Sequence, residues 1–318
     1  MTSPSRPSVA VVGAGAVGCY FGGMLARAGV PVTLIGRATH VDAIRRDGLR
    51  MDTLTFSERV PVPASTDIAE VAGAAVVLLC VKTGDTASSA ASVAPHLRPG
   101  GVVVSMQNGV GNAPVIRRAV PGVIIPAAVY VSAEMSGPGH LRHNGRGDLV
   151  IGRDQHAPGP VASFDAALDT VERVFVGAGV PCRRSAAIDV DLWSKLAMNC
   201  AYNAISALGR SRYGRLAAEP ATRAVLELAV HELEAVAAAE GVDLSGANLV
   251  DAAHRLSAGF PEALSSTAQD IALGRRTEID DLNGYVFTRG AAHGIATPVN
   301  QTLHALVKLL EAAPREGA

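Results

Sequence analysis

Six residues that join a short apolar run to a helical pattern constrain the fold more than any other feature of the chain. Gly13 permits a tight turn, Gly15 lets the backbone approach a bound group, and Gly18 allows close packing of helix and strand. The start of the helix then offers free N–H groups to an anion. We expect the pyrophosphate of a nicotinamide dinucleotide to be held by Gly13, Ala14, Gly15, Ala16, Val17 and Gly18. The alternative is a turn whose glycines serve only close packing.

The end of the second predicted strand indicates which dinucleotide is bound. Val32–Ile35 leads into Gly36 and Arg37, and the first carboxylate after it is that of Asp42. NAD-binding units usually carry an acidic residue here for the ribose 2′-hydroxyl, whereas an arginine accommodates the 2′-phosphate of NADPH. Such a charge-assisted contact contributes about 1.5 to 3 kcal/mol. The sequence therefore favours NADPH bound by Arg37, with a solvated surface arginine as the alternative.

Short apolar runs alternate with helical patterns through the first half of the chain, which is typical of a parallel sheet covered by crossover helices. The predicted strands are Val9–Val12, Val32–Ile35, Val76–Val81, Val102–Ser105 and Val123–Val131. Helical periodicity predicts Val17–Ala28 and Thr86–His96. Leu141–Ile151 has the pattern of a hairpin that turns at Asn144-Gly145. Together these segments predict an α/β fold with an N-terminal Rossmann-type, doubly wound sheet.

Strand signals stop after about Arg184, and the remainder shows helical patterns separated by glycine and proline. A chain of 318 residues exceeds the size at which one hydrophobic core keeps growing, so two domains are expected. We predict an NADP-binding Rossmann domain at residues 1–184 and an all-helical domain at residues 185–318. In the second domain, the predicted helix Ala221–Glu240 precedes Gly241, which stands where glycine commonly ends helices.

Composition excludes several classes of partner. The formal net charge is −1 and no block of lysine or arginine occurs, so neither a nucleic acid nor an anionic membrane is an expected partner. The longest apolar stretch, Val71–Val81, is too short to span a bilayer, and Met1–Ser8 lacks the apolar run of a signal peptide. The four cysteines and nine histidines show no metal-ligand spacing. We expect a cytoplasmic protein that binds a small molecule and no metal. The sequence leaves open whether the protein forms a homodimer.

A helical segment in the second half, Trp193–Ser206, carries a stripe of polar residues. At 100° per residue, one helix face collects Lys195, Asn199, Asn203 and Ser206. This face holds one cation and two amides rather than the mixed charges of a solvated surface, which indicates the lining of a cleft. A second polar but patterned stretch covers residues 265–284. The alternative for both is hydrogen bonding between the helices of an all-α domain.

Several motifs, each weak alone, become specific through their order and spacing. They are the Gly13–Gly18 turn, Val81-Lys82-Thr83, Gln107-Asn108-Gly109, Trp193-Ser194-Lys195-Leu196 with Asn199 and Asn203, Ser265-Ser266 with Gln269-Asp270, and Thr277-Glu278-Ile279-Asp280 with Asn283-Gly284. Together they resemble the ketopantoate reductase (2-dehydropantoate 2-reductase) family over nearly the whole chain. The resemblance implies reduction of a 2-keto acid, ketopantoate, by NADPH on the route to pantothenate. It also implies a Rossmann domain and a helical domain flanking a cleft.

The same resemblance assigns roles to single residues. Lys195 matches the family's catalytic lysine, whose ammonium stabilises and protonates the oxygen that becomes negative when hydride reaches the carbonyl carbon. Glu278 matches a catalytic-site residue that orients this lysine or the nicotinamide ribose. The substrate would be bound by Asn108, Asn199, Asn203 and Ser266. Besides the turn and Arg37, the cofactor would be contacted by Lys82, Asn108, Ala133 and Glu278.

One departure from the family leaves the substrate open. Many members carry Asn-Gly in the loop after the lysine helix, whereas this chain has Tyr213-Gly214. Either the Tyr213 hydroxyl replaces the missing amide, or the site accepts another 2-keto acid. Two further alternatives are a related hydroxyacid dehydrogenase that uses NAD and a non-catalytic NADPH sensor.

Overall fold

The computed structural model describes residues 6–313, which divide into two compact units. One unit comprises Met1–Gln107 and Gly111–Ile188, and the other comprises Asn108–Val110 and Asp189–Ala318. The loop Asn108–Val110 therefore belongs to the helical unit, although the chain on both sides of it belongs to the first unit. Most of the N-terminal stretch in which we found no signal-peptide pattern, residues 1–5, lies outside the described residues.

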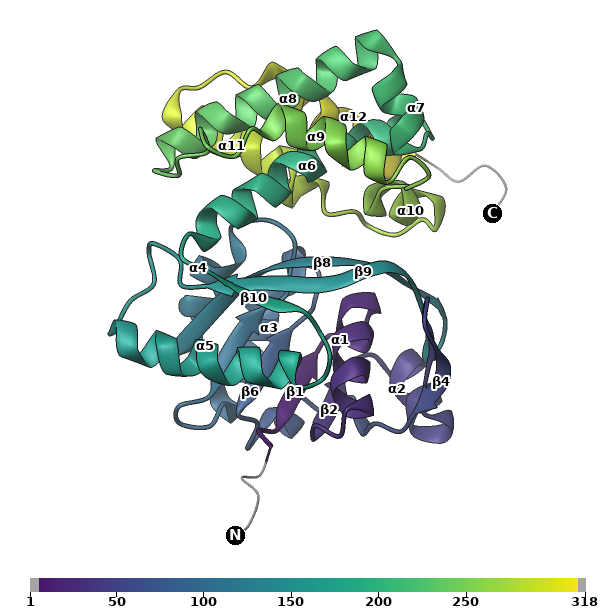
Figure 1. Cartoon of the computed structure of the whole chain (residues 1–318), viewed down its shortest axis with the longest axis vertical. Coiled ribbons are helices and arrows are strands. Elements are labelled where there is room, and N and C mark those ends of the chain that lie inside the picture. The colour runs from purple at the N-terminus through teal and green to yellow at the C-terminus, as the bar shows by residue number, and fades with distance from the viewer. Residues whose placement is uncertain (1–5, 314–318) are drawn as a thin grey trace. The chain divides into compact units, whose positions relative to one another are not determined.

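The first unit is a mixed sheet flanked by helices (Figure 1). Its strands are β1 (Val9–Val12), β2 (Val32–Ile35), β3 (Leu49–Asp52), β4 (Ser57–Val60), β5 (Ala64–Ser65), β6 (Val76–Leu79), β7 (Val102–Ser105), β8 (Val123–Gly137), β9 (His140–Gly152) and β10 (Cys182–Ser185). Its helices are α1 (Ala16–Arg27), α2 (Ala38–Asp47), α3 (Thr86–Val93), α4 (Asn112–Arg117) and α5 (Val161–Val176), with 3-10 turns η1 (Ile68–Val71), η2 (Thr83–Asp85) and η3 (Ala94–His96). The strand order is β4-β3-β9-β8-β7-β6-β1-β2-β5, and β10 pairs with β9.

Consecutive residues of the central parallel strands face two separate cores. Val11 of β1 belongs to a cluster with Phe21 of α1 and residues of α5. Its neighbour Val12 belongs to a cluster with Val93 of α3 and residues of α4. A strand that is buried on both faces needs apolar side chains at every position, which explains why β1 and β6 are unbroken apolar runs. The predicted doubly wound arrangement is therefore confirmed.

The hairpin predicted within Leu141–Ile151 is wrong, because β9 spans this whole segment as one strand. It pairs antiparallel with β8, and the turn between the two strands is Pro138-Gly139. At Asn144-Gly145 the register of β8 and β9 shifts, so one residue of β9 has no opposite neighbour. Bulges, like hairpin turns, use glycine at positive φ, and the φ of Gly145 is 154°. The Asn-Gly pair thus marks a β-bulge, and long β8 supplies the partner that keeps the chain extended.

The second unit is helical, as predicted. Its elements are α6 (Ile188–Leu208), α7 (Tyr213–Ala218), α8 (Pro220–Ala239), α9 (Leu249–Gly259), α10 (Ser266–Ala272), the 3-10 turn η4 (Ile279–Asp281), α11 (Asn283–His293) and α12 (Pro298–Ala312). The main core packs Trp193 and Leu196 of α6 against Leu233 of α8 and Val286 of α11. Helix α8 lies within one residue of its predicted bounds, and Gly241 beyond its end has a φ of 81°.

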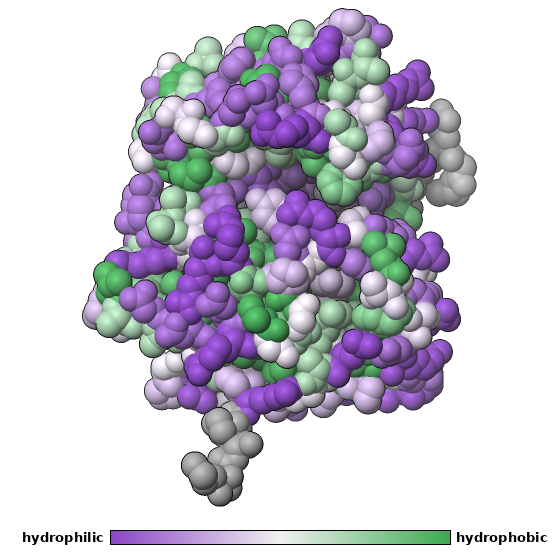
Figure 2. Space-filling model, in the orientation of Figure 1, coloured by the Kyte–Doolittle hydropathy of each residue, from purple (hydrophilic) through white to green (hydrophobic). Residues whose placement is uncertain are grey.

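On the face shown in Figure 2, hydrophilic residues cover much of the surface and hydrophobic residues lie scattered among them. Within residues 6–313, no helix combines the length and the apolar character needed to cross a membrane. All four cysteines are unpaired, and burial raises the pKa of the Cys19 thiol to about 12. This thiol is therefore neutral and unreactive at physiological pH.

Candidate active site

Two glycines of the Gly13–Gly18 turn are required by packing within the protein. Gly13 has a φ of 109°, and a Cβ there would lie 2.7 Å from the backbone of Cys80. A Cβ on Gly18 would lie 2.1 Å from the carbonyl oxygen of Gly13. Both distances are far shorter than real Cβ contacts, so β1, α1 and the end of β6 meet only because these residues lack side chains.

Gly15 is different, because nothing within the protein explains a glycine there. Its φ is −91°, which any residue adopts, and a Cβ on it would meet no atom within 4 Å. The space above it therefore suits a bound group that approaches the backbone closely. Gly15 also caps α1 without a side-chain hydrogen bond, and the first turn of α1 contains no acidic residue. The helix thus keeps its first N–H groups for an anion, and the turn fits the pyrophosphate of a dinucleotide.

Two cations follow neighbouring strands at the same edge of the sheet as the turn. A Cβ on Gly36, after β2, would lie 2.6 Å from Cβ of Ala14, so the next residue, Arg37, stands beside the turn. Arg37 is exposed and precedes α2, and Lys82 is exposed beyond β6. Because β1 lies between β2 and β6, these cations flank the turn at the carboxyl ends of parallel strands. Ala133 lies elsewhere on the sheet, on β8 beyond its pairing with β7.

Three polar side chains from distant parts of the sequence meet in the helical unit. Nζ of Lys195 on α6 donates to Oδ1 of Asn108 at 2.9 Å, and Nδ2 of Asn108 donates to Oε2 of Glu278 at 2.9 Å. All three residues are half-buried. Because the amide directs its donor to Glu278, its carbonyl oxygen must face Lys195. Asn108 therefore links an ammonium to a carboxylate and sets the direction of both hydrogen bonds.

The C-terminal part of the polar stripe on α6 supports helix α10. Asn203 and Ser206 are buried, and Ser206 donates to a backbone carbonyl at 2.8 Å. Oγ of Ser265 donates to the carbonyl oxygen of Asn203 at 3.1 Å and caps α10. Ser266, the residue singled out in the sequence, is the exposed first residue of α10, and Asn199 is half-buried. Hydrogen bonds with Ser211 in the loop after α6 and with Ser265 at the start of α10 thus account for Ser206, whereas Asn199 and Ser266 are accessible.

Tyr213 stands beside one of the predicted substrate residues. The centroid of its ring lies 4.6 Å from that of Tyr202. Its hydroxyl donates to Oδ1 of Asn203 over a long distance of 3.5 Å. Burial raises the pKa of Tyr213, so the hydroxyl stays protonated and remains a donor at neutral pH. This hydrogen bond occupies Oδ1 of Asn203, whose side chain is buried.

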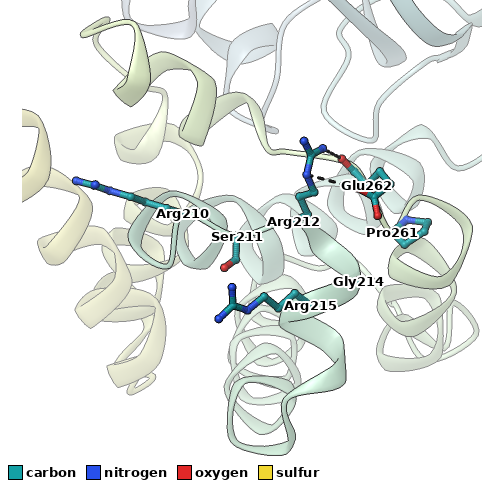
Figure 3. A pocket seen from close by; sticks show the side chains of 7 residues that line it. All are labelled: Arg210, Ser211, Arg212, Gly214, Arg215, Pro261 and Glu262. Atoms are coloured by element: carbon teal, nitrogen blue, oxygen red, sulfur yellow. Dashed lines mark hydrogen bonds and ion pairs between the residues drawn. The ribbon is translucent and has the colours of Figure 1, made fainter.

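A cavity of about 420 Å³ adjoins the Tyr213-Gly214 segment. Figure 3 shows its lining residues, Arg210, Ser211, Arg212, Gly214, Arg215, Pro261 and Glu262. Nε of Arg212 lies 3.4 Å from Oε2 of Glu262, and the two side chains point toward each other in Figure 3. The N–H groups of Tyr213 and Gly214 donate to the carbonyl oxygens of Ala263 and Pro261. The two segments that line the cavity are therefore hydrogen-bonded to each other. Our sequence reasoning missed this cavity, although three arginines within residues 210–215 were a signal for it.

Comparisons with known proteins agree along most of the chain. The model of the family described as Ketopantoate reductase PanE/ApbA matches residues 9–156, and the model of its C-terminal part matches residues 187–311. A 2-dehydropantoate 2-reductase of Halobacterium salinarum is 37% identical over 97% of this chain and 99% of its own length. A 2-dehydropantoate 2-reductase of Vibrio cholerae is 29% identical over 96% of this chain and 98% of its own length.

Solved structures have the same fold. A PanE/ApbA family ketopantoate reductase from Ralstonia eutropha JMP134 is 47% identical, with a TM-score of 0.87 over 96% of this chain and 98% of that chain. A D-mandelate dehydrogenase bound to NADH and anilino(oxo)acetate is 25% identical, with a TM-score of 0.86 over 96% of this chain and 98% of that chain. The predicted resemblance, the two-part fold and the oxidoreductase class are thereby confirmed. This chain belongs to the ketopantoate reductase PanE/ApbA family.

Proposed function

We propose that the chain reduces the keto group of 2-dehydropantoate (ketopantoate) to the hydroxyl of pantoate with NADPH, a step of pantothenate biosynthesis. The observation that supports this most is the link from Lys195 through Asn108 to Glu278, because a ketone reduction needs a proton donor held at the carbonyl oxygen. Family membership supports the same reaction. NADPH is the cofactor of this family, as Arg37 led us to expect.

NADPH supplies a hydride to the carbonyl carbon of the substrate. Negative charge then collects on the carbonyl oxygen, where the Lys195 ammonium stabilises it and delivers the proton that completes the hydroxyl. Lys195 regains a proton from solvent. Asn108 restrains Nζ through its carbonyl oxygen, and Glu278 prevents the amide from flipping by accepting its N–H. The ammonium is thus held in place before the substrate arrives, which lowers the cost of reaching the transition state.

The carboxylate and hydroxyl of the substrate are assigned to donors on α6 and α10. Asn199 lies one helical turn after Lys195 on the same face of α6, and Asn203 lies one turn further. Ser266 opens α10, whose cap is bound to Asn203. Since the Tyr213 hydroxyl occupies Oδ1 of Asn203, the amide offers its nitrogen, a donor suited to a carboxylate.

The proposed cofactor site uses the backbone of the Gly13–Gly18 turn for the pyrophosphate and Arg37 for the 2′-phosphate. Lys82, Ala133, Asn108 and Glu278 are assigned the remaining cofactor contacts. In this proposal residues 1–184 form the NADP-binding domain and residues 185–318 form the substrate domain. Four unpaired cysteines suit the reducing cytoplasm. The proposal is compatible with a homodimer.

The experiment that tests the reaction measures NADPH oxidation with ketopantoate and with a panel of short branched and unbranched 2-keto acids. We expect the highest kcat/KM with ketopantoate, and a loss in kcat of about 10²-fold or more for Lys195→Ala. Gln301→Ala, an exposed change on α12, is the control. A near-normal kcat for Lys195→Ala would overturn the assigned role. Absence of turnover with every 2-keto acid would instead favour a non-catalytic NADPH sensor.

A second candidate is the reduction of a different 2-keto acid with NADH. Two observations favour it: Tyr213 stands where many family members carry asparagine, and a structural neighbour holds NADH and anilino(oxo)acetate. Arg37→Ala separates the two candidates. If Arg37 binds the 2′-phosphate, the KM for NADPH rises about tenfold or more and the KM for NADH stays constant. Equal effects on both cofactors would favour the second candidate.

A further inference from the structure

The segment that carries Glu278 has little regular structure of its own. Residues 273–278 connect α10 to η4 outside any helix or strand, and Gly274 has a φ of 58°. Such a segment has no ladder of hydrogen bonds to hold it, so its polar groups need partners from other elements. Gly274 and Arg275 donate their N–H groups to α10, whereas partners of Thr277 and Asp280 come from α12. They lie on one face of α12, where His304, Lys308 and Glu311 follow at intervals of four and three.

Helix α12 binds the residue directly before Glu278. Oε1 of Glu311 accepts hydrogen bonds from the N–H of Thr277 at 2.7 Å and from its hydroxyl at 2.6 Å. Oε2 of Glu311 lies 3.1 Å from Nζ of Lys308. Partial burial acts to raise the pKa of Glu311, but the hydrogen bonds from Thr277 and Lys308 outweigh it and leave that pKa below its usual value. The carboxylate is therefore ionised at neutral pH, and its hydrogen bonds are charge-assisted.

The same face of α12 also binds the chain just after Glu278. Nε2 of His304 lies 2.7 Å from Oδ1 of Asp280, and Nζ of Lys308 donates to Oδ2 at 2.9 Å. Between these anchors, the side chain of Ile279 is fully buried in a cluster with apolar residues of α12. Glu278 is thus held from both sides by a single helix.

Resting on the proposed function, we propose that Glu311 and Lys308 are positioning residues for the reduction. Glu311 binds the N–H and the hydroxyl of Thr277 before Glu278, and Lys308 binds the carboxylate of Asp280 after it. Together they place the Glu278 carboxylate where Asn108 can bind it and restrain Lys195. A misplacement of about 1 Å at a reacting group lowers a rate by up to about 10²-fold. Because the contacts from α12 lead through Glu278 and Asn108 to Nζ of Lys195, we expect their loss to act mainly on the chemical step.

The kinetic test compares Glu311→Ala with Glu311→Gln, using the 2-keto acid that the wild type reduces best. Alanine removes both bonds to Thr277, so we expect kcat to fall about 10- to 100-fold, with a smaller change in the KM for NADPH. Glutamine keeps an oxygen acceptor and should return kcat to within about threefold of wild type. Gln301→Ala, exposed on the same helix, should change neither constant. A kcat within twofold of wild type in a folded Glu311→Ala would overturn the proposal.

A double-variant cycle separates positioning from general loosening of the fold. If Glu311 acts through Glu278, then adding Glu311→Ala to Glu278→Gln lowers kcat by less than about twofold further. An effect of Glu311→Ala that is as large in the Glu278→Gln background as in the wild type would show a merely structural role. Thermal unfolding of each variant verifies that it is folded.

A readout that needs no activity uses the scarcity of lysine in this chain. Its only lysines are Lys82, Lys195 and Lys308, so protein labelled with 13C at lysine Cε gives three assignable NMR signals. We expect Glu311→Ala to shift the Lys195 signal and to leave the Lys82 signal in place. If Glu311→Ala does not fold, Lys308→Met removes the anchor on Asp280 and should shift the same signal. An unmoved Lys195 signal contradicts the positioning role, whereas a moved signal in a protein that reduces no 2-keto acid contradicts only the proposed function.

Discussion

The Gly13–Gly18 turn and the link from Lys195 through Asn108 to Glu278 are built on opposite principles. The turn is six consecutive residues, and its properties depend on side chains that are absent. The link joins residues that are 87 and 170 positions apart, and its properties depend on which side-chain atom donates and which accepts. Substitutions in the turn should therefore alter folding and cofactor affinity. Substitutions in the link should alter the rate of the chemical step.

Gly18→Ala should have the largest effect and tests the steric half of this comparison. The new methyl group would lie 2.1 Å from the carbonyl oxygen of Gly13, so α1 has to move away from β1. We expect the free energy of unfolding to fall by about 3 kcal/mol. Urea unfolding without cofactor measures it. Gly15→Ala is the matched control, and equal losses for both variants would contradict the steric explanation.

Asn108→Asp tests the polar half, because it keeps the shape of the side chain and replaces the donor that faces Glu278 with an oxygen. Two carboxylates about 2.9 Å apart disfavour double ionisation, so the pair retains a proton to a higher pH than either group alone. We expect kcat to fall about 100-fold at pH 8, or about 2.7 kcal/mol. Part of this loss should be recovered near pH 5.5, where the proton restores a donor. A pH–rate profile with the same loss at every pH would exclude this explanation.

Gly15→Val probes the part of the turn whose glycine the protein itself does not require. The side chain would enter the open space above the backbone, where the pyrophosphate is expected. We expect the Kd for NADPH to rise about tenfold, or about 1.4 kcal/mol, with no change in the stability of the free protein. Titration followed by NADPH fluorescence measures the affinity. An unchanged Kd would argue that the turn serves only packing.

Asp281→Asn should have the smallest effect and tests whether the surroundings of Glu278 respond to pH. Burial and then the charges of Glu278 and Asp280 raise the pKa of Asp281 from 3.8 to about 6. The folded protein therefore binds this proton more tightly than the unfolded chain does, and it loses stability as the pH rises from about 4 to about 6. The amide removes that cost, so we expect a gain of about 1 kcal/mol at pH 8, discounted for partial exposure.

Thermal unfolding at several pH values measures the effect of Asp281→Asn. The gain should shrink by pH 4.5, because Asp281 is then largely protonated in the folded wild type. The Gly13–Gly18 turn contains no ionisable side chain, so Gly15→Ala should show no such pH dependence. A gain for Asp281→Asn that is constant with pH would point to packing rather than charge.

Sequence patterns predicted the parts of the fold that depend on near neighbours. The apolar runs of β1, β2 and β7 and the helix α8 lie within one residue of their predicted bounds, because burial on both faces or on one helical stripe leaves a local pattern. The short strands β3 and β4 were not predicted. Polar and exposed residues such as Arg50 and Glu58 alternate with few apolar ones there, so pairing with a neighbouring strand defines these strands.

The predicted hairpin at Asn144-Gly145 failed for a related reason. The dipeptide supplies a backbone conformation that both a turn and a bulge can use, and only the partner strand decides between them. The candidate site divides in the same way. Helical periodicity placed Lys195 and Asn199 on one face, but it carried no information on the contact with Asn108 or on the anchoring of Glu278 by α12. The roles assigned to these residues stay predictions until the variants are measured.

The sequence by itself determined the Gly13–Gly18 turn, the alternation of strand and helix, and the family, because each leaves a signal within a short window or in the order of motifs. The tertiary structure alone decided which side chains meet Lys195, why Gly15 differs from Gly13 and Gly18, and how α12 holds Glu278. The physical reason is the separation along the chain over which each interaction acts. Backbone conformation is set by adjacent residues, whereas a hydrogen bond between side chains depends on two elements that the sequence leaves far apart.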